Sequence, residues 1–334
     1  MKICIIKLGA DGDVLRTIPL AKALKDENTG SEITWITKGD VGSLLSDLDY
    51  INRVVDFSKS EDLLEEQFDK MYNFDFDKEA LELAGKIKAE KKYGFKDDSG
   101  YPAAYNFGAE YYLNTMFDDE LKKTNKKTYQ EMMFELAEIP IKKERINLVL
   151  NEDDRWLGQQ FLDMYSLIGE DIIGIHMGAS SRWPSKAWHI DRVKEFIILA
   201  EKKGYAVILF GGPNESDKHR ELSEELKKEG IDIYRNDPKN TKKEFASLVN
   251  ICDVFVCADS FSSHVSLGLN KPTVTLFFVT NPVEIEGYNL MEKIIAPRFS
   301  EFFPEKSDQY DEDLVKSISA EDVFEKASNL IRKE

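Results

Sequence analysis

The sequence predicts an α/β protein made of two doubly wound, Rossmann-like domains, and three observations lead to this fold class. Short apolar runs of strand length alternate with segments of helical periodicity along the chain. Small residues, glycine above all, follow several of the apolar runs, as they do in the strand-to-helix turns of parallel sheets. The length of 334 residues corresponds to about two domains of roughly 150 residues each.

The first half opens with a strand at Ile3–Leu8, a glycine turn at Gly9–Asp13 and a helix at Val14–Lys25. Pro19 is expected in the first turns of that helix, where its missing N–H is tolerated. The turn is not GxGxxG, so the fingerprint of dinucleotide binding is absent. The elements expected next are a strand at Glu32–Thr37, a short helix at Gly42–Asp47, a strand at Val54–Phe57, an acidic helix at 60–70, a strand at Met71–Phe76, a loop entering a helix at Tyr101–Tyr112, a helix at Tyr129–Ala137 and a short strand closing at Val149.

A linker helix at Asp153–Tyr165 precedes a second series of alternating strands and helices, so the sequence places the domain boundary near 166–171. We therefore expect a first domain at 1–168, a second at 169–312 and a terminal segment at 313–334. The second series comprises strands at Ile172–His176, Tyr205–Phe210, Ile231–Tyr234, Val254–Cys257 and Thr273–Phe278, and helices at Asp191–Lys203, Ser216–Glu229, Phe245–Ile251 and Glu321–Arg332.

Composition narrows the classes of function. A net charge of −17 argues against a nucleic-acid partner, because phosphate binding needs a basic surface. The three cysteines, Cys4, Cys252 and Cys257, lie in apolar runs and are expected to be core residues without disulfide or zinc. No apolar run has the length of a membrane span, and the N-terminus lacks the features of a signal peptide, so we expect a cytoplasmic protein.

Asp13 is the first candidate catalytic residue. It follows the first predicted strand and stands where the first helix begins, so an N-cap role is one interpretation. The other is a general base, because open α/β sheets place their sites at the carboxyl ends of their strands.

A candidate phosphate-binding loop follows the strand Ile172–His176. The small residues Gly178-Ala179-Ser180-Ser181 would let a ligand approach the backbone N–H groups, and Lys186 would neutralise phosphate. The alternative is an ordinary strand-to-helix loop with a solvent-exposed lysine.

Two later strands are also followed by polar residues. After Tyr205–Phe210 comes Gly211-Gly212-Pro213-Asn214-Glu215, in which Glu215 either accepts hydrogen bonds from a ribose or favours the start of a helix. After Val254–Cys257 comes a dense polar cluster whose members face a phosphate or sugar in the functional interpretation. These residues are Asp259, Ser260, Ser262, Ser263 and His264. Helix capping by Asp259 and a core position for His264 are the structural alternatives.

Two lysine clusters stand out in this acidic chain, at 84–96 and at Leu121–Lys127. They are either solvated surface or a docking surface for an acidic acceptor or an anionic membrane face. The candidate acceptor-binding lysines are Lys88, Lys91, Lys92, Lys122 and Lys123.

Four motifs, taken together and in order, resemble glycosyltransferase family 9, which contains the ADP-heptose:lipopolysaccharide heptosyltransferases. They are KLGADGDVLRTIPLAKAL, GIHMGASSRWPSKAWHIDRV, VILFGGPNE and DVFVCADSFSSHVSLGLNKPTVTLFF, and they span nearly the whole chain. The resemblance implies a GT-B fold, in which two Rossmann-like domains face each other across a cleft and the C-terminal helix returns to the N-terminal domain. It also implies inverting, metal-independent transfer of a sugar, with heptose from ADP-heptose as the expected donor and a lipopolysaccharide core or related glycan as the acceptor. No metal and no cofactor are expected, and a peripheral position on the inner membrane face is compatible with a glycolipid acceptor.

The resemblance also assigns roles to individual residues. Asp13 matches the proposed catalytic base, Lys186 with Ser180 and Ser181 matches the diphosphate-binding loop, and Glu215 matches the ribose-binding carboxylate. Asn240 and Thr241 fall where the family's backbone meets adenine, while Asp259, Ser260, Ser262 and His264 belong to the motif that reads the sugar and phosphates. Phe261 departs from this motif, because the family usually has glycine there. Two alternatives remain: a nucleotide-sugar epimerase, which would use the same fold for a different chemistry, and a nucleotide-sugar-binding protein that Phe261 has made catalytically inactive.

Overall fold

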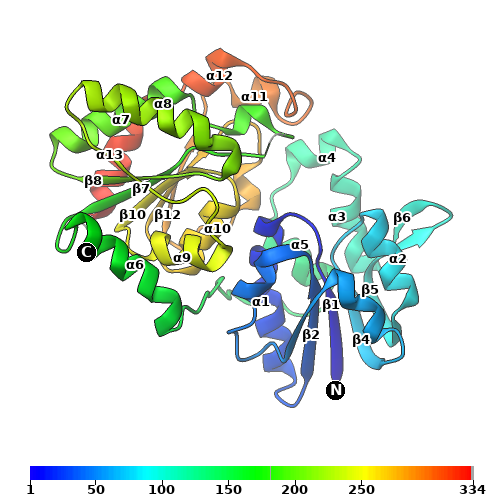
Figure 1. Ribbon diagram of the computed structural model, residues 1–334. Coiled ribbons are helices and arrows are strands. Elements are labelled where there is room, and N and C mark those ends of the chain that lie inside the picture. Colours follow the sequence, from blue (N-terminus) through cyan, green and yellow to red (C-terminus); the bar gives the residue numbers. More distant parts are fainter. Residues whose placement is uncertain (181, 332–334) are drawn as a thin grey trace. The chain divides into compact units, whose positions relative to one another are not determined.

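The computed structural model describes residues 1–180 and 182–331, which form two compact units (Figure 1). The first unit comprises Met1–Val149 together with Val283–Glu286. The second comprises Leu150–Pro282 and the chain from Gly287 onward. Each unit contains one six-stranded sheet among the described residues, so the prediction of an α/β protein with two Rossmann-like domains is confirmed.

The sheet of the first unit has the strand order β3-β2-β1-β4-β5-β6, in which all neighbours are parallel except β5 and β6. The strands are β1 (Lys2–Ile6), β2 (Glu32–Thr37), β3 (Arg53–Asp56), β4 (Gln67–Asn73), β5 (Lys88–Asp98) and β6 (Tyr101–Ala104). The helices are α1 (Asp11–Glu27), α2 (Lys78–Lys86), α3 (Glu110–Thr115), α4 (Asp119–Thr124) and α5 (Tyr129–Leu136), with 3₁₀ turns η1 (Gly39–Leu44), η2 (Phe57–Leu63) and η3 (Phe107–Ala109).

The sheet of the second unit is parallel throughout, with the order β12-β11-β10-β7-β8-β9. Its strands are β7 (Ile172–His176), β8 (Ala206–Phe210), β9 (Tyr234–Arg235), β10 (Val254–Ala258), β11 (Thr273–Phe277) and β12 (Met291–Ile295). Its helices are α6 (Glu152–Tyr165), α7 (Ile190–Lys202), α8 (Ser216–Lys228), α9 (Lys242–Asn250), α10 (Phe261–Gly268), α11 (Phe299–Phe302), α12 (Glu312–Lys316) and α13 (Ala320–Ile331), with 3₁₀ turns η4 (Pro184–Lys186), η5 (Pro213–Glu215) and η6 (Pro282–Glu284).

Both sheets reverse their direction of winding at one pair of neighbouring strands. In the first unit this pair is β1 and β4, and in the second it is β7 and β10. Open α/β sheets bind ligands outside the carboxyl ends of the strands at this switch point, because the loops diverge there and leave a crevice. The residues directly after these four strands are therefore where a site is expected.

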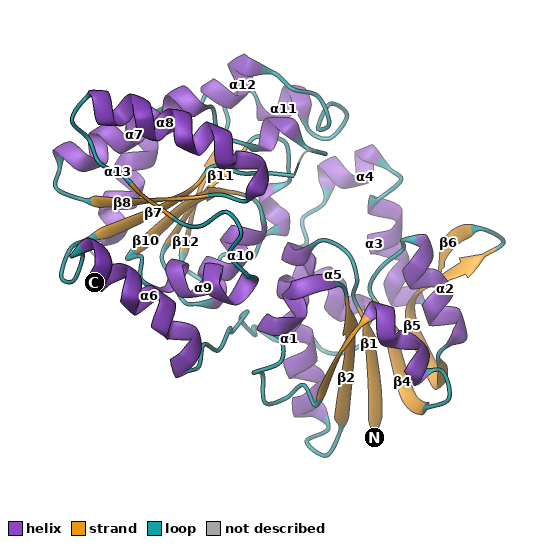
Figure 2. Cartoon of the chain, viewed as in Figure 1, coloured by secondary structure: helices purple, strands orange, loops and turns teal. Residues whose placement is uncertain are grey.

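The second sheet is covered on both faces (Figure 2). Alternate strand residues such as Ile175, Leu209 and Val256 form one core with the apolar faces of α7, α8 and α13. On the opposite face Phe210 packs against Phe255 and against Phe245 of α9. Strands buried on both faces must be apolar at every position, which explains why they stand out as continuous runs in the sequence.

The first sheet also packs its apolar strand residues against helices. Cys4, Ile6 and Met71 pack against Ala80 and Ala84 of α2 on one face. All three cysteines of the chain are buried free thiols, as expected, and burial raises the pKa of Cys4 to about 12.

Several predicted elements differ from those observed. Pro19 lies in the interior of α1, because the helix already begins at Asp11 and not at Val14, so the Leu15 carbonyl lacks a helical donor. The acidic stretch at 60–70 is not a helix: η2 ends at Leu63, and β4 begins at Gln67. The stretch that ends at Val149 has no strand pairing, and the strand expected at Ile231–Tyr234 is reduced to Tyr234–Arg235.

The domain limits also require correction. The expected boundary near 166–171 is wrong for α6, because this helix packs against α9 and belongs to the second unit. The expectation that the terminal helix returns to the N-terminal domain is also wrong, since α13 packs on α7, β10 and β11. Val323 and Ala327 are fully buried in the core of the second unit, which gives α13 its position.

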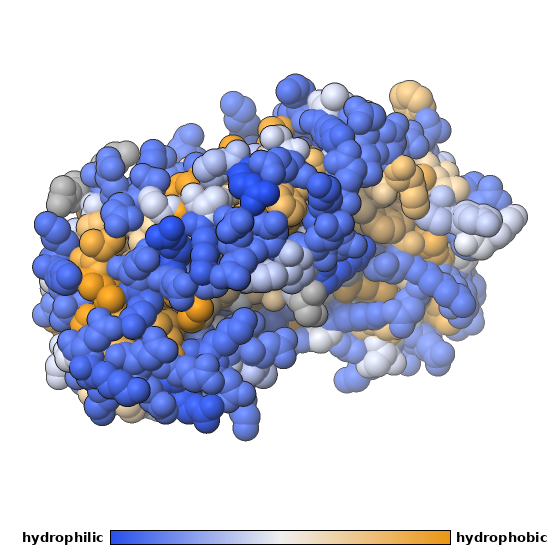
Figure 3. Space-filling model, turned by 90° about the horizontal axis from the view of Figure 1, so that it is seen from above, coloured by the Kyte–Doolittle hydropathy of each residue, from blue (hydrophilic) through white to orange (hydrophobic). Residues whose placement is uncertain are grey.

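The visible surface is mostly hydrophilic, with smaller apolar areas between charged side chains (Figure 3). Within residues 1–180 and 182–331, none of the helices combines the length and apolar character needed to cross a bilayer.

Candidate active site

Asp13 lies in the first turn of α1, after the short loop 7–10 that leaves the carboxyl end of β1. It is not the N-cap of the helix, because Ala10 holds that position. Its carboxylate oxygens each face a cation: Oδ2 lies 3.9 Å from Nζ of Lys7, and Oδ1 lies 3.6 Å from Nε of Arg16. The side chain is 35% exposed, so a substrate hydroxyl can reach the carboxylate. A carboxylate that a hydroxyl can reach is a candidate for a general base.

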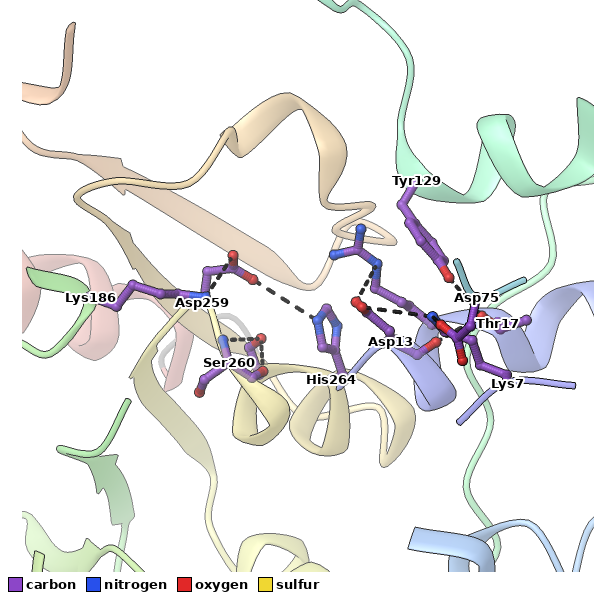
Figure 4. A network of polar contacts seen from close by, with 11 residues as sticks. Lys7, Asp13, Thr17, Asp75, Tyr129, Lys186, Asp259, Ser260 and His264 are labelled. Atoms are coloured by element: carbon purple, nitrogen blue, oxygen red, sulfur yellow. Dashed lines mark hydrogen bonds and ion pairs between the residues drawn. The ribbon is translucent and has the colours of Figure 1, made fainter. Parts of the chain in front are cut away.

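Lys7 and Asp75 form a buried ion pair at the switch point of the first sheet (Figure 4). Lys7 follows β1, and Asp75 comes two residues after β4 ends. Burial opposes the charge on Lys7, but Asp75 and the more distant Asp13 raise the pKa of Lys7 well above its ordinary value. The ammonium group beside Asp13 is therefore permanently charged.

Two aromatic residues, Tyr112 and Tyr129, pack beside the charged side chains of this cluster. The guanidinium of Arg16 lies 3.7 Å above the ring of Tyr129, a cation–π contact. The hydroxyl of Tyr129 is 3.0 Å from Oγ1 of Thr17, which donates a hydrogen bond to the backbone carbonyl of Asp13. Tyr112 packs edge-on against Tyr129, and burial raises the pKa of both phenols. Both phenols are therefore neutral. The contacts of Tyr129 with Arg16 and Thr17 hold Arg16 and the first turn of α1 in place.

A second polar cluster occupies the switch point of the second sheet, where Asp259 follows β10 (Figure 4). Its Oδ2 lies 3.5 Å from Nζ of Lys186, and its Oδ1 lies 4.0 Å from Nε2 of His264. All three side chains are buried or nearly so. The structure thus brings together a lysine, an aspartate and a histidine that the sequence had placed on three separate segments.

The N-terminus of α10 adds backbone donors next to Asp259. Ser260 is the N-cap residue, and its Oγ lies 2.8 Å from Oγ of Ser262. Ser263 donates from its hydroxyl to the Ser260 carbonyl at 2.7 Å. The first N–H groups of a helix have no acceptor within the helix, so this end of α10 suits an anion. Helix capping by Asp259 itself, one of the two structural alternatives, is ruled out by the position of Ser260.

Phe261 is the first residue of α10 and packs toward α9. Its ring lies 5.8 Å from that of Phe245, and Nζ of Lys242 lies 4.4 Å above it. Because Phe261 has helical geometry, the glycine that is usual in the family is not required here for backbone conformation. The ring is a packing element between two helices of the second unit.

Glu215 lies against the small residues that follow β7 and β8. It accepts a hydrogen bond from Gly212 N at 2.9 Å, and a Cβ added to Gly178 would come within 2.9 Å of its carboxyl carbon. A Cβ added to Gly211 would meet the ring of His219 at 2.5 Å. These turns need glycine because the side chains of Glu215 and His219 fill the space. Glu215 thus lies beside the turns that follow β7 and β8, where the donor site is expected.

The remaining predicted donor residues have local structural partners. Ser180 accepts from Arg182 N at 3.3 Å, and Ser181 lies outside the described residues. Asn240 accepts a hydrogen bond from Asn236, and Thr241 is the N-cap of α9, where it forms a capping box with Glu244.

The candidate acceptor lysines do not form one patch. Lys88 pairs with Glu65, and Lys92 donates to the Ala84 carbonyl at the C-terminal end of α2. Lys91 lies on the opposite face of β5, because side chains alternate along a strand. Lys122 and Lys123 lie on α4, where Lys123 pairs with Glu120.

In the described part of the chain, no group of three or more histidine, cysteine, aspartate or glutamate side chains is arranged to hold a metal ion. Four residues of the first cluster, Lys7, Arg16, Asp75 and Tyr129, were missed by the sequence interpretation. A signal existed for two of them, because Lys7 and Asp75 are charged residues inside or beside otherwise apolar strands.

Comparison with known proteins identifies the family. Residues 58–310 match the family described as Glycosyltransferase family 9 (heptosyltransferase). The chain is 22% identical over 308 residues to the lipopolysaccharide core heptosyltransferase OpsX of Haemophilus influenzae, covering 88% of this chain and 84% of that protein. It is 21% identical over 318 residues to lipopolysaccharide heptosyltransferase 1 of Escherichia coli, covering 89% of this chain and 94% of that protein.

Solved structures show the same fold. A family 9 glycosyltransferase from Veillonella parvula superposes with a TM-score of 0.80 at 19% identity, covering 100% of this chain and 97% of the other. The ADP-heptose lipopolysaccharide heptosyltransferase II of E. coli gives 0.74 at 19% identity, covering 100% and 99%. The match of the family over most of the chain, together with this fold, establishes that the protein is a glycosyltransferase of GT-B fold that belongs to glycosyltransferase family 9.

Proposed function

We propose that this enzyme transfers heptose from ADP-heptose to a lipopolysaccharide core or a related surface glycan. The observation that carries the proposal is the Lys186–Asp259–His264 cluster at the switch point of the second sheet, on a chain whose relatives are named as lipopolysaccharide heptosyltransferases. The choice of ADP-heptose also draws on the solved E. coli heptosyltransferase II, which is named for that donor.

The second unit binds the donor in this proposal. Lys186 and the N-terminal N–H groups of α10 hold the diphosphate, because an ammonium group and a helix N-terminus both stabilise negative charge. Glu215 accepts hydrogen bonds from the ribose, and the turn at Asn240 and Thr241 meets the adenine. Asp259 orients Lys186, with which it is paired.

Asp13 of the first unit acts as the general base. The acceptor hydroxyl loses its proton to Asp13 as its oxygen attacks the anomeric carbon of heptose. The bond from that carbon to the diphosphate oxygen breaks on the opposite side, so configuration inverts and ADP leaves. The negative charge that develops on ADP is stabilised by Lys186 and α10, and the proposal requires no metal ion.

The acceptor is a glycolipid or glycan with anionic groups, which the candidate lysines Lys91 of β5 and Lys122 of α4 would meet. A glycolipid acceptor would bring the enzyme to a membrane face as a peripheral protein. The buried free thiols of the three cysteines support residence in a reducing compartment such as the cytoplasm.

Turnover with ADP-heptose and a heptose-deficient lipopolysaccharide core tests the proposal. We expect ADP release and a heptosylated product, both unaffected by a chelator, and a drop in kcat of about 10²–10⁴-fold in Asp13→Asn with ADP affinity unchanged. Asp11→Asn, in the same helical turn, serves as the matched control and should retain activity.

Two results would contradict the transfer reaction, and a third would contradict only the role of Asp13. Conversion of the donor sugar without an acceptor would make the protein an epimerase, and ADP binding without turnover would make it a degenerate binding protein. Full activity in Asp13→Asn would be compatible with the transfer reaction but would show that Asp13 is not the base.

A further inference from the structure

We propose that Lys7 and Asp75 are positioning residues that set the basicity and orientation of Asp13. This inference rests on the proposed role of Asp13 as the base. Neither Lys7 nor Asp75 is expected to touch the substrate, because their side chains are only 3% and 6% exposed. They would act through Asp13 alone.

The strand order brings the two residues together. β1 and β4 are parallel neighbours with Ile6 opposite Asn73, so the chain segments that leave their carboxyl ends start side by side. Lys7 is the first residue after β1, and Asp75 follows Asn73 by two positions. The Asn73 side chain accepts a hydrogen bond from Asp75 N, which fixes the start of that second segment. The pair is thus built into the switch point of the sheet.

Asp75 anchors the loop that precedes Asp13. Its carboxylate accepts hydrogen bonds from the Lys7 ammonium group and from the backbone N–H groups of Leu8 and Gly9, the last at 2.7 Å. A Cβ added to Gly9 would come within 3.0 Å of Oδ1 of Asp75, so glycine allows this close approach. Because the loop joins β1 to α1, Asp75 fixes the backbone that leads directly into Asp13.

The charges around Asp13 fall into a definite order (Figure 4). Within the described residues of the first unit, the titratable groups around Asp13 include Lys7 with its partner Asp75, Tyr112 and Tyr129 from the packed elements, and Arg16 from its own helix. Both phenols stay neutral, so within this unit the charges nearest Asp13 are the cations Lys7 and Arg16, with Asp75 paired to Lys7. Lys7 favours ionised Asp13, while Asp75 offsets the charge of Lys7 and leaves Asp13 basic enough to accept a proton.

Opposite effects on the acid limb of the pH profile of kcat/KM follow from this order. Lys7→Met removes a cation, so the limb should move to higher pH by about one unit. Asp75→Asn removes the offsetting charge, so the limb should move to lower pH. Lys7→Arg should restore the wild-type position. ADP affinity should stay constant in all three, because the proposed donor residues belong to the second unit.

Titration of the Asp13 carboxyl by carbon NMR in the ADP-free protein gives the same readout without turnover. Exposed Lys22 and Asp26 form an ion pair on α1, so Lys22→Met and Asp26→Asn are matched controls that should leave the titration of Asp13 unchanged. If Lys7→Met fails to fold because Asp75 is left as an uncompensated buried charge, the double variant Lys7→Met/Asp75→Leu replaces it. In the double variant, the loss of the Lys7 charge affects Asp13 more than the loss of the Asp75 charge, because Lys7 is the residue that faces Asp13. The titration of Asp13 should therefore still move to higher pH.

The outcomes separate the two proposals. An unmoved Asp13 titration in the Lys7 and Asp75 variants would overturn the positioning role and make the pair merely structural, whatever the activity. Opposite shifts combined with full activity of Asp13→Asn would uphold the positioning role and overturn only the assignment of Asp13 as the base.

Discussion

The ammonium group of Lys186 lies 3.5 Å from the carboxylate of Asp259, and this pair joins the end of η4 to the end of β10. The lysine thus has its charge balanced before any ligand is present. A diphosphate would become a second anionic partner of the same ammonium group, held at the N-terminal end of α10. The pair therefore links the two loops that are proposed to hold the donor.

Loss of the Lys186 charge should weaken ADP binding. We expect Lys186→Met to raise the Kd of ADP about 10–100-fold, because a charge-assisted hydrogen bond to phosphate is lost. Isothermal titration calorimetry measures the change. Lys194, a partly exposed lysine of α7 paired with Glu225 and Glu229, gives the control Lys194→Met, for which the Kd should not change. Equal Kd values for wild type and Lys186→Met would remove Lys186 from the donor site.

Replacement of Phe261 by glycine should cost stability without strengthening ADP binding. The ring packs against Phe245 and Lys242, so its loss should lower the free energy of unfolding by about 1–3 kcal/mol. Chemical denaturation followed by ADP titration measures both effects. Tighter ADP binding in Phe261→Gly would instead show that the ring narrows the donor pocket.

The candidate acceptor lysines should differ in what they affect: Lys91 and Lys122 should affect acceptor binding, and Lys92 should affect stability. Lys91→Glu combined with Lys122→Glu should raise the KM for the acceptor while the KM for the donor stays constant, since an anionic acceptor would meet reversed charge. Lys92→Met should instead lower the melting temperature, because Lys92 bonds the last carbonyls of α2. An unchanged acceptor KM in the double variant would assign these lysines to solvated surface.

Acid should destabilise the second unit through His219. This residue is 2% exposed, and burial together with the charge of Arg235 lowers its pKa from 6.5 to about 4. The unfolded chain therefore takes up the proton first, so stability is fully present above pH 6.5 and is lost as the pH falls toward 4. Between pH 7 and pH 5 the loss from His219 should be on the order of 2 kcal/mol, and His176, whose pKa burial and the neighbouring His219 lower to about 4, adds a loss of the same sign.

Calorimetric unfolding at the two pH values checks this expectation. His219→Gln should reduce the difference in stability between pH 7 and pH 5, whatever its effect at pH 7. His189→Gln, in the N-cap of α7, removes another histidine of the same unit and should leave most of the difference in place. A pH dependence of His219→Gln equal to that of the wild type would show that another group is responsible.

The fold class and most strand positions were predictable because local chemistry decides them. Strands buried on both faces, such as Val254–Ala258, must be apolar throughout, and glycine is needed where Glu215 and His219 crowd the turns after β7 and β8. The positions of Asp259 at a strand end, and of Asp13 and Lys186 in the segments that follow β1 and β7, were predicted from the same pattern, although their contacts were not.

The order of strands in the sheets was decided by the tertiary structure. The pairing of β1 with β4 brings Lys7 to Asp75 across 68 positions of sequence, and no local pattern specifies that pairing. The docking of α13 in the second unit likewise depends on which apolar face its residues Val323 and Ala327 find, and an amphipathic helix alone does not name its partner. The sequence by itself determined the elements and the residue types at their ends, because these depend on neighbours along the chain. Which of those ends meet, and hence which charges face Asp13 and Asp259, was decided by long-range packing.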